Sequence, residues 1–339
     1  MTTRYNEQFI TILSSLSKLM MQMGEHFRAR AYEKASDSII QYGKDITSID
    51  QLKKLKLKNI GSTTMNKLEE YVTTGKVEKL EKEKNNPIKL FTDVYGIGPK
   101  KAKELVKKNK INTISELRKH TNLLNDKQII GLKYYEDILK RIPRNEIVEY
   151  EKILKRVFKQ VSKDNNIDTS SFEIVGSFRR GATNSGDIDI IVTDKNNDST
   201  IFNAFIDELT KKNILIESLS RGDKKSLTIA KLPNKTPRRV DFMYTPYDEY
   251  GFAILYFTGS KIFNTVMRHE ALKQGYTMNE HGLYKMENRI KNDKISTKLP
   301  DEKAIFKFLG FKYVKPTERT NGNNLVSINN DIKNITAKM

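Results

Sequence analysis

Apolar and polar positions alternate with a helical period through the first 142 residues. Apolar side chains recur every three or four positions in FITILSSLSKLMMQM and again in HFRARAYEKASDSIIQY. This pattern predicts short helices over residues 6–80 and 88–142, separated by the polar, proline-terminated segment KEKNNP at 82–87. A longer amphipathic helix is predicted at 147–163.

The pattern then changes from helices to a mixture of strands and helices. Four β-branched or aromatic runs bounded by turn residues predict strands: FEIVGSF, DIDIIVT, SLTIAKL and RRVDFMY. Helices are expected at IFNAFIDELTKKN, between two of these runs, and at FNTVMRHEALKQGY. After Pro316 the sequence becomes rich in asparagine, which predicts a disordered tail. The layout indicates an α+β protein with several domains.

The amino-acid composition indicates that the protein binds a polyanionic partner. The 339 residues include 61 Lys and Arg against 42 Asp and Glu, a formal net charge of +19. Such an excess favours nucleic acid, with an anionic membrane surface as the second candidate, although lysine-rich helices are often only solvated faces. No cysteine is present, which excludes disulfides, thiolate metal sites and cysteine nucleophiles. We find no apolar run of 18 residues and no signal-peptide stretch, so we expect no membrane span, and with nucleic acid preferred we expect no membrane partner.

Two glycine-containing turns in the helical half share one form. NIGSTTMNKL contains Gly61, and YGIGPKKAKEL contains Gly96 and Gly98; both lead into a predicted helix. Backbone N–H groups at such a turn can bind a phosphate, and glycine permits its close approach. A single copy is more often an ordinary helix start, but two copies in a basic region favour contact with a DNA backbone.

Three aspartates form the strongest chemical signal. Asp187 and Asp189 are two residues apart in a strand-like run, so their side chains lie on one face. Asp241 falls on a second predicted strand, and adjacent strands would bring the three carboxylates together. Oxygen-only ligands suit Mg²⁺ or Mn²⁺, and a pair of such ions can serve phosphoryl transfer. The simpler explanation of Asp-X-Asp alone is an exposed strand face.

Residues just before the paired aspartates argue against that simpler explanation. Gly176, Ser177 and Gly186 offer backbone and hydroxyl donors for phosphate oxygens. Arg180 offers a planar cationic fork for a transferring phosphoryl group. Anion donors beside cation ligands are the arrangement that a metal–triphosphate needs.

With these residues in place, the chain resembles the family X DNA polymerases, most closely the beta branch. The motifs are GSFRRG, SGDID, RRVD and YFTGSKIFNTVMR, and the resemblance covers about residues 10–318. It implies an α+β multidomain fold with two helix-hairpin-helix motifs and a nucleotidyltransferase palm with a mixed sheet. The implied parts are a helical lyase domain (1–82), a helical, fingers-like DNA-binding subdomain (83–144), the palm (145–258), a small α+β C-terminal subdomain (259–318) and the tail (319–339).

The resemblance also implies roles for single residues in nucleotide addition. Asp187 and Asp189 would bind both metals, and Asp241 would bind the catalytic metal and help to deprotonate the primer 3′-hydroxyl, with Arg239 beside it. Gly176, Ser177, Arg180 and Gly186 would hold the triphosphate. The sugar and base would meet Tyr256, Phe257, Gly259, Lys261 and Asn264, and Arg268 would reach the template strand. Without their neighbours, Tyr256 and Phe257 could equally be core aromatics.

A second chemistry is implied for the N-terminal domain, which resembles a deoxyribose-phosphate lyase. Lys67 falls at the position of the Schiff-base nucleophile, and only a neutral amine can attack the sugar. Arg28, Tyr32 and Lys34 would bind the 5′-phosphate and position the sugar. Taken without the resemblance, Lys67 would be an ordinary solvated helix lysine.

The helix-hairpin-helix likeness further implies two monovalent cation sites, for Na⁺ or K⁺, built from backbone carbonyls. Their ligands would be Leu55, Leu57 and Ile60 in the first copy and Thr92, Val94 and Ile97 in the second. Asn59 replaces a common glycine in the first turn, so the second copy fits the pattern better.

Four residues depart from the beta branch: Thr63 replaces a phosphate-binding lysine, Met243 an arginine, Lys261 an acid and His281 a tyrosine.

The expected protein is a monomeric, soluble intracellular enzyme, with nucleus, cytoplasm and viral factory or virion left open. It would be a template-directed polymerase that fills short gaps in base excision repair. Its substrates would be gapped or nicked DNA bearing a 5′-phosphate and deoxynucleoside triphosphates, with two Mg²⁺ (Mn²⁺ as an alternative) and a DNA ligase as a further partner. The alternatives are a template-independent or loosely templated nucleotidyltransferase and a catalytically silent DNA-binding scaffold.

Overall fold

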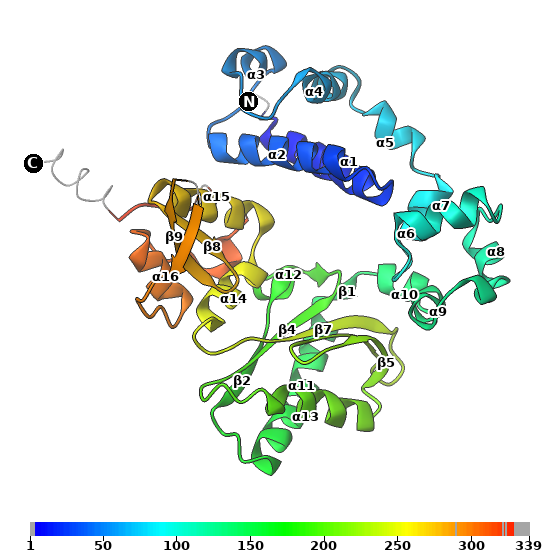
Figure 1. Ribbon diagram of the computed structural model, residues 1–339, viewed down its shortest axis with the longest axis vertical. Helices are drawn as coiled ribbons and strands as arrows, with labels where there is room; N and C mark the ends of the chain where they lie inside the picture. The colour runs from blue at the N-terminus through cyan, green and yellow to red at the C-terminus, as the bar shows by residue number, and fades with distance from the viewer. Residues whose placement is uncertain (1–3, 289, 321, 323, 329–339) are drawn as a thin grey trace, which may run out of the picture. The chain divides into compact units, whose positions relative to one another are not determined.

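The structure is a computed structural model that describes residues 4–288, 290–320, 322 and 324–328 (Figure 1). The chain divides into two compact units, Met1–Tyr135 and Glu136–Met339, and each is described by itself. Among the described residues, no helix combines the length and the apolar character needed to cross a membrane.

The first unit is helical throughout, as its periodicity predicted. Its elements are α1 (Asn6–Gln22), α2 (His26–Tyr42), α3 (Ile49–Leu55), α4 (Ser62–Thr74), α5 (Glu78–Lys82), α6 (Pro87–Thr92), α7 (Pro99–Lys107), α8 (Ile114–Arg118), the 3-10 helix η1 (Thr121–Leu123) and α9 (Asp126–Lys133). Helix α10 (Tyr135–Leu139) begins at the boundary between the units. Pro87 and Pro99 stand in the first turns of α6 and α7, where a missing N–H costs nothing.

Two hydrophobic clusters support this unit. Phe9 and Leu13 of α1 pack with Ile39 of α2, and this cluster extends to α3 and α4. A second cluster contains Phe91 of α6 and Leu105 of α7. Each glycine turn noted above lies over one of these clusters, so the turns are fixed on packed helices.

The second unit contains all of the strands and the remaining helices. Its elements are β1 (Ile142–Pro143), α11 (Arg144–Asp164), β2 (Ser170–Ile174), α12 (Gly176–Arg179), β3 (Asn184–Ser185), β4 (Ile188–Asp194), α13 (Thr200–Lys211), β5 (Leu215–Arg221), β6 (Lys225–Ala230), β7 (Arg238–Tyr244), α14 (Tyr250–Thr258), α15 (Lys261–Lys273), β8 (Tyr276–Asn279), β9 (Gly282–Glu287), β10 (Ile290–Lys294), α16 (Glu302–Phe308) and the 3-10 helix η2 (Pro316–Glu318).

A five-stranded mixed sheet with the order β2-β4-β7-β6-β5 forms the centre of this unit. Strands β4 and β7 are parallel, whereas the other neighbours are antiparallel. Helices α11 and α13 cover one face (Figure 1), where Ile188 and Ile190 of β4 are buried with them. Ile191 points to the opposite face and packs against α14. The alternation of side chains therefore leaves Asp189 and Asp241 on the face away from α11 and α13.

The C-terminal part adds a second, smaller core to the unit. Three antiparallel strands in the order β10-β9-β8 pack with α15 and α16. Phe263 of α15 and Phe306 of α16 are fully buried and stacked, with ring centroids 6.0 Å apart. The expected α+β fold, with a helical first part and a mixed palm sheet, is confirmed.

Three local expectations need correction. The run FEIVGSF is not one strand, because β2 ends at Ile174 and Gly176–Arg179 form the helical turn α12. The sequence analysis also missed several strands: β1, β3, β5 and β8–β10. The run LIESLSR of β5 has no clear alternation. The described tail residues are also ordered from residue 319 onward: Arg319 is fully buried, and Ser327 forms a β-bridge with Phe311. The expectation of disorder for residues 329–339 lies outside the described residues.

Candidate active sites

The three aspartates predicted to act together converge at the start of β4 and the middle of β7. Asp187 directly precedes β4, and Asp189 lies opposite Asp241 in the parallel register. One carboxylate oxygen of each residue lies within 4.8 Å of the other two. Three oxygen ligands at this spacing fit one or two divalent cations, which is the donor set that Mg²⁺ and Mn²⁺ prefer.

The electrostatics of the cluster also favour a bound cation. Burial raises the pKa of Asp189 to about 7, and the neighbouring Asp187 and Asp241 add to the shift. Burial likewise raises the pKa of Asp241, although Arg239 opposes this. A divalent cation would offset the cost of burying these charges and would remove their mutual repulsion.

Arg239 holds Asp241 in a fixed orientation. Its Nη2 atom donates to Oδ2 at 2.6 Å and its Nε atom donates to Oδ1 at 3.1 Å. The two residues are two apart on β7, so both side chains lie on the same face of the sheet. This bidentate contact leaves the carboxylate with its outer lone pairs available for a cation.

Among the residues predicted to hold a triphosphate, Gly176 borders the same cluster. Gly176 has a φ of +65°, and a Cβ added there would lie 3.0 Å from Oδ2 of Asp189. The Ser177 hydroxyl donates to the buried Ser185 hydroxyl at 2.7 Å. Arg180 donates to the carbonyl of Thr258 at 2.5 Å, and burial lowers its pKa. Helix α12 carries Gly176 and Ser177 and packs against α14.

Arg141 was missed by the sequence analysis. Its guanidinium donates to Oδ1 and to the backbone carbonyl of Asn184, at 2.7 and 2.9 Å. A Cβ added to Gly186 would lie 3.1 Å from its Nη1 atom. The Arg141 guanidinium therefore lies beside Gly186, in the turn that leads into Asp187. The only sequence signal was a basic residue two positions before Pro143, which is too weak to assign a site.

The residues predicted for the nucleotide pocket lie on α14 and α15. Tyr256 is partly exposed, and its ring contacts Phe257 edge to face, with centroids 5.1 Å apart. Gly259 ends α14 with a φ of +64°. Asn264 donates through Nδ2 to the carbonyl of Tyr256 at 2.7 Å, so its amide is already engaged by the backbone. Lys261 begins α15, and Arg268 lies exposed on that helix.

The two glycine turns have matching backbones. Asn59 has a φ of +64° and Gly96 a φ of +83°, so asparagine adopts the left-handed conformation here. In each turn the N–H of the apolar residue donates to the backbone carbonyl three residues earlier. Ile60 donates to Leu57, and Ile97 donates to Val94. Gly61 and Gly98 precede the first turns of α4 and α7. The first copy thus forms the same turn as the second despite its asparagine.

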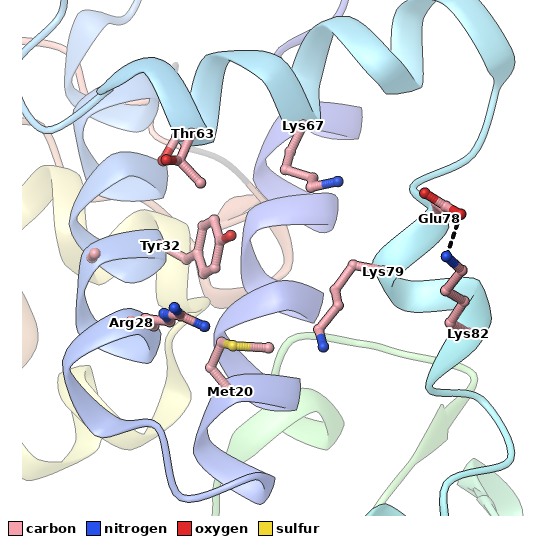
Figure 2. Close-up of a pocket in the computed structure, with 10 residues that line it drawn as sticks. Met20, Arg28, Tyr32, Thr63, Lys67, Glu78, Lys79 and Lys82 are labelled. Carbon is pink, nitrogen blue, oxygen red and sulfur yellow. Dashed lines mark ion pairs between the residues drawn. The ribbon is translucent and has the colours of Figure 1, made fainter.

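A separate cavity of about 530 Å³ lies in the first unit around Lys67 (Figure 2). Arg28 and Tyr32 of α2 and Thr63 and Lys67 of α4 line it. The Lys67 amine also forms an ion pair with Glu70 at 2.6 Å. Lys34, which was expected to join this site, is exposed and is not among the lining residues.

Two lining lysines were missed by the sequence analysis. Lys79 and Lys82 of α5 border the cavity, and Lys79 extends toward it from the side opposite Tyr32 (Figure 2). Lys82 pairs with Glu78 at 2.5 Å, and Lys79 pairs with Glu83 at 2.9 Å. Lys79 adds a cation to the cavity, where Thr63 stands in place of the expected phosphate-binding lysine. No sequence pattern separated these lysines from the many exposed ones.

Comparison with known proteins now places this arrangement in a family. Four family models match consecutive segments: a helix-hairpin-helix domain at 4–77, the fingers domain of DNA polymerase lambda at 89–139, the DNA polymerase beta palm at 141–247 and the DNA polymerase beta thumb at 253–320. The chain belongs to the family X DNA polymerases. The carboxylate cluster lies within the matched palm segment, and the Lys67 cavity lies mostly within the matched helix-hairpin-helix segment.

Curated family X relatives match over most of this chain. DNA polymerase lambda of Arabidopsis thaliana is 34% identical over 93% of this chain, and that of Rattus norvegicus is 30% identical over 94%. DNA nucleotidylexotransferase of Xenopus laevis is 28% identical over 88% of the chain. The chain spans only 62%, 56% and 66% of the lengths of these relatives.

Proposed function

We propose that the chain is a DNA-directed DNA polymerase that fills short gaps from deoxynucleoside triphosphates. The observation that carries this proposal is the convergence of Asp187, Asp189 and Asp241 within 4.8 Å on two parallel strands. When bound to these carboxylates, divalent cations supply a Lewis acid for the phosphates and lower the pKa of a coordinated hydroxyl. Magnesium is the proposed metal, with manganese as the alternative.

The chain's own residues would then position the reacting groups. Asp241, oriented by Arg239, would receive the primer 3′-hydroxyl and take up its proton. The 3′-oxygen forms a bond to the α-phosphorus as the bond to the departing pyrophosphate breaks. Ser177 and Arg180 would hold the phosphates, and Gly176 leaves room for them beside Asp189.

The test is filling of a one-nucleotide gap in a duplex with a 5′-phosphate. We expect Asp241→Asn to lose nucleotide insertion while gapped-DNA affinity stays within about threefold of wild type. Asp223→Asn is a matched control, because Asp223 is exposed in the turn between β5 and β6. Insertion by Asp241→Asn near the wild-type rate would refute the site.

The likeness to a DNA nucleotidylexotransferase supports a second candidate, nucleotide addition that does not follow a template. Extension of a single-stranded primer separates the two activities. A template-directed enzyme adds, in the gap, the nucleotide complementary to the template base, and it leaves the single-stranded primer unextended. Comparable extension of both substrates would favour the second candidate.

We also propose a 5′-deoxyribose-phosphate lyase in the Lys67 cavity. The neutral Lys67 amine would attack C1′ of the open-chain sugar and release water to form an imine. Loss of the C2′ proton then breaks the C3′–O bond and frees the DNA 5′-phosphate. The support is a lysine on a packed helix, bordering a cavity that Arg28 and Lys79 make cationic.

Borohydride trapping on DNA with a 5′-sugar phosphate tests this second activity. Lys67→Ala should lose the trapped adduct and keep gap filling. Lys79→Ala is the matched control, because Lys79 is a second amine at the same cavity. Undiminished trapping by Lys67→Ala together with loss in Lys79→Ala would move the nucleophile to Lys79.

The remaining proposals concern parts and partners. We propose the five parts with the boundaries given above, binding of gapped or nicked DNA at the two glycine turns, and Na⁺ or K⁺ at their carbonyls. A monomeric state, a DNA ligase partner and an intracellular location are proposed as well. Sedimentation with and without gapped DNA tests the monomeric state, and two protein copies per gap would overturn it.

A further inference from the structure

A groove on the second unit takes no part in the chemistry proposed above. It has a volume of about 530 Å³ and lies between α11, the turn from α13 into β5, and the loop that follows β6. We call it the α11 groove. Three features of the groove bear on what it binds: the apolar residues at its base, the charge of its rim and the face of the sheet on which it lies.

The floor of the α11 groove is apolar. Ile153 of α11 and Ile214 before β5 are partly buried and pack against the main core. Ile216 of β5 and the buried Leu232 extend this floor. Partly exposed isoleucines beside one another are a surface that a leucine or phenylalanine side chain can cover.

The rim of the α11 groove is cationic. Among the described residues that line it, three are basic and none is acidic. Arg156 and Lys231 are exposed and form no salt bridge with any residue in the described ranges, while Lys212 pairs with Glu208 at 3.0 Å. Two unpaired cations beside an apolar floor complement a ligand that carries carboxylates next to an apolar side chain.

The groove lies on the face of the sheet away from the carboxylate cluster. Phe242 of β7 is buried with α11 and α13, and the preceding Asp241 points to the opposite face. DNA positioned at Asp241 therefore does not occupy this groove. The exposed rim is open to solvent, which suits an extended chain better than a small ligand that needs to be enclosed.

We propose that the α11 groove binds an acidic peptide segment of a partner protein. One apolar side chain of the peptide covers Ile153, Ile214 and Ile216, and flanking Asp or Glu carboxylates contact Arg156 and Lys231. Contacts of this kind join a polymerase to a second protein without blocking its DNA-binding face. The proposal holds whether or not the chain proves to be a gap-filling enzyme.

The probe is a fluorescein-labelled peptide in which Leu and Phe alternate with Asp and Glu, measured by fluorescence anisotropy with the full chain. We expect the double variant Arg156→Glu/Lys231→Glu to weaken binding by at least about tenfold. The matched control, Lys163→Glu/Lys195→Glu, makes the same change in charge at exposed positions outside the groove. It should bind within about twofold of wild type.

Two further probes complete the test. A peptide with Ser in place of Leu and Phe should bind at least about tenfold more weakly, because the floor would be left uncovered. A single-stranded oligonucleotide should bind the groove variant and the control variant equally. The proposal fails if the wild-type chain does not bind the peptide, if both double variants lose it equally, if the serine peptide binds as well, or if the groove variant selectively loses the oligonucleotide.

Discussion

The guanidinium of Arg239 contacts both carboxylate oxygens of Asp241, at 2.6 and 3.1 Å. An arginine fork restricts a carboxylate to one plane, whereas a single hydrogen bond leaves it free to rotate. Burial raises the pKa of Asp241, and the hydrogen bond and charge of Arg239 act against this rise. Arg239 is therefore a positioning residue that also favours the ionised form of Asp241.

We expect Arg239→Gln to lower the rate of gap filling by about 10- to 100-fold with little loss of gapped-DNA affinity. Arg239→Lys should recover only part of the rate, because an ammonium retains the charge but lacks the planar fork. Single-turnover kinetics at saturating DNA measure both. Arg221→Gln, at the exposed end of β5, is the control. Equal rates for the lysine and glutamine variants would show that charge does not contribute.

Asp189 should destabilise the metal-free protein at neutral pH and above. Its folded-state pKa of about 7 exceeds the ordinary value of 3.8, so the folded state binds the proton more tightly and loses stability as the pH rises between these values. Asp189→Asn should therefore stabilise the second unit at pH 8 by roughly 1–3 kcal/mol in EDTA. The gain should shrink toward pH 5. Denaturant unfolding at both pH values tests this, and a gain in unfolding free energy that does not depend on pH would contradict it.

The same shift predicts how metal affinity depends on pH. Below about pH 7 a cation must displace the proton held by Asp189. Mn²⁺ affinity of the DNA-free chain should therefore fall by up to about tenfold per pH unit below 7 and level off above it. Titration followed by electron paramagnetic resonance measures this. The Asp189→Asn variant should bind more weakly with a flatter profile, and an unchanged profile would place the displaced proton on another residue.

Glu70 should restrain the proposed lyase nucleophile through their ion pair. Its carboxylate lies 2.6 Å from the Lys67 amine, and hydrogen bonds from Lys67 and the Glu78 N–H lower its pKa. This ion pair holds the Lys67 amine against Glu70, so the contact must break before the amine can attack the sugar. Glu70→Gln weakens this contact and should therefore speed borohydride trapping by about a few-fold. Glu69→Gln is the control, because Glu69 pairs with Lys53 instead. Slower trapping would indicate that Glu70 acts as a base.

Much of the fold was predictable, because its signals are local in the sequence. Period-3.6 patterns located the helices of the first unit, and Asp187 and Asp189 lie on one face because a strand alternates its side chains. The parallel pairing of β4 with β7 was not predictable from these patterns. The register that sets Asp189 opposite Asp241 depends on the crossover through α13, β5 and β6.

The residues that were missed act through contacts distant in the chain. Arg141 reaches Gly186 only because β1 pairs with β3, and Lys79 reaches the Lys67 cavity only because α5 follows the turn after α4. Each looked like one more surface cation in a chain with 61 Lys and Arg. Arg319 was assigned to a disordered tail because its asparagine-rich surroundings concealed its burial.

Glu302 and Arg319 should matter greatly for stability, because they form a buried charge network. Arg319 is fully buried and donates to Glu302 at 2.5 Å, and Arg179 of α12 donates to the same carboxylate at 2.9 and 3.1 Å. Although burial alone would raise the pKa of Glu302, hydrogen bonds from both arginines lower it. The network ties the C-terminal part of the unit to the turn that carries Ser177 and Arg180.

Glu302→Gln should cost about 3–5 kcal/mol of unfolding free energy, because it leaves the Arg319 charge buried without a partner. Melting of the second unit should shift down by roughly 5–15 °C. Asp293→Asn, on the exposed strand β10, should melt like wild type. Glu302→Met/Arg319→Met removes both charges and should recover part of the loss. The double variant could instead melt at a lower temperature than Glu302→Gln. That result would mean that losing the hydrogen bonds of Arg319, such as those to the Val314 carbonyl, costs more than removing its buried charge gains.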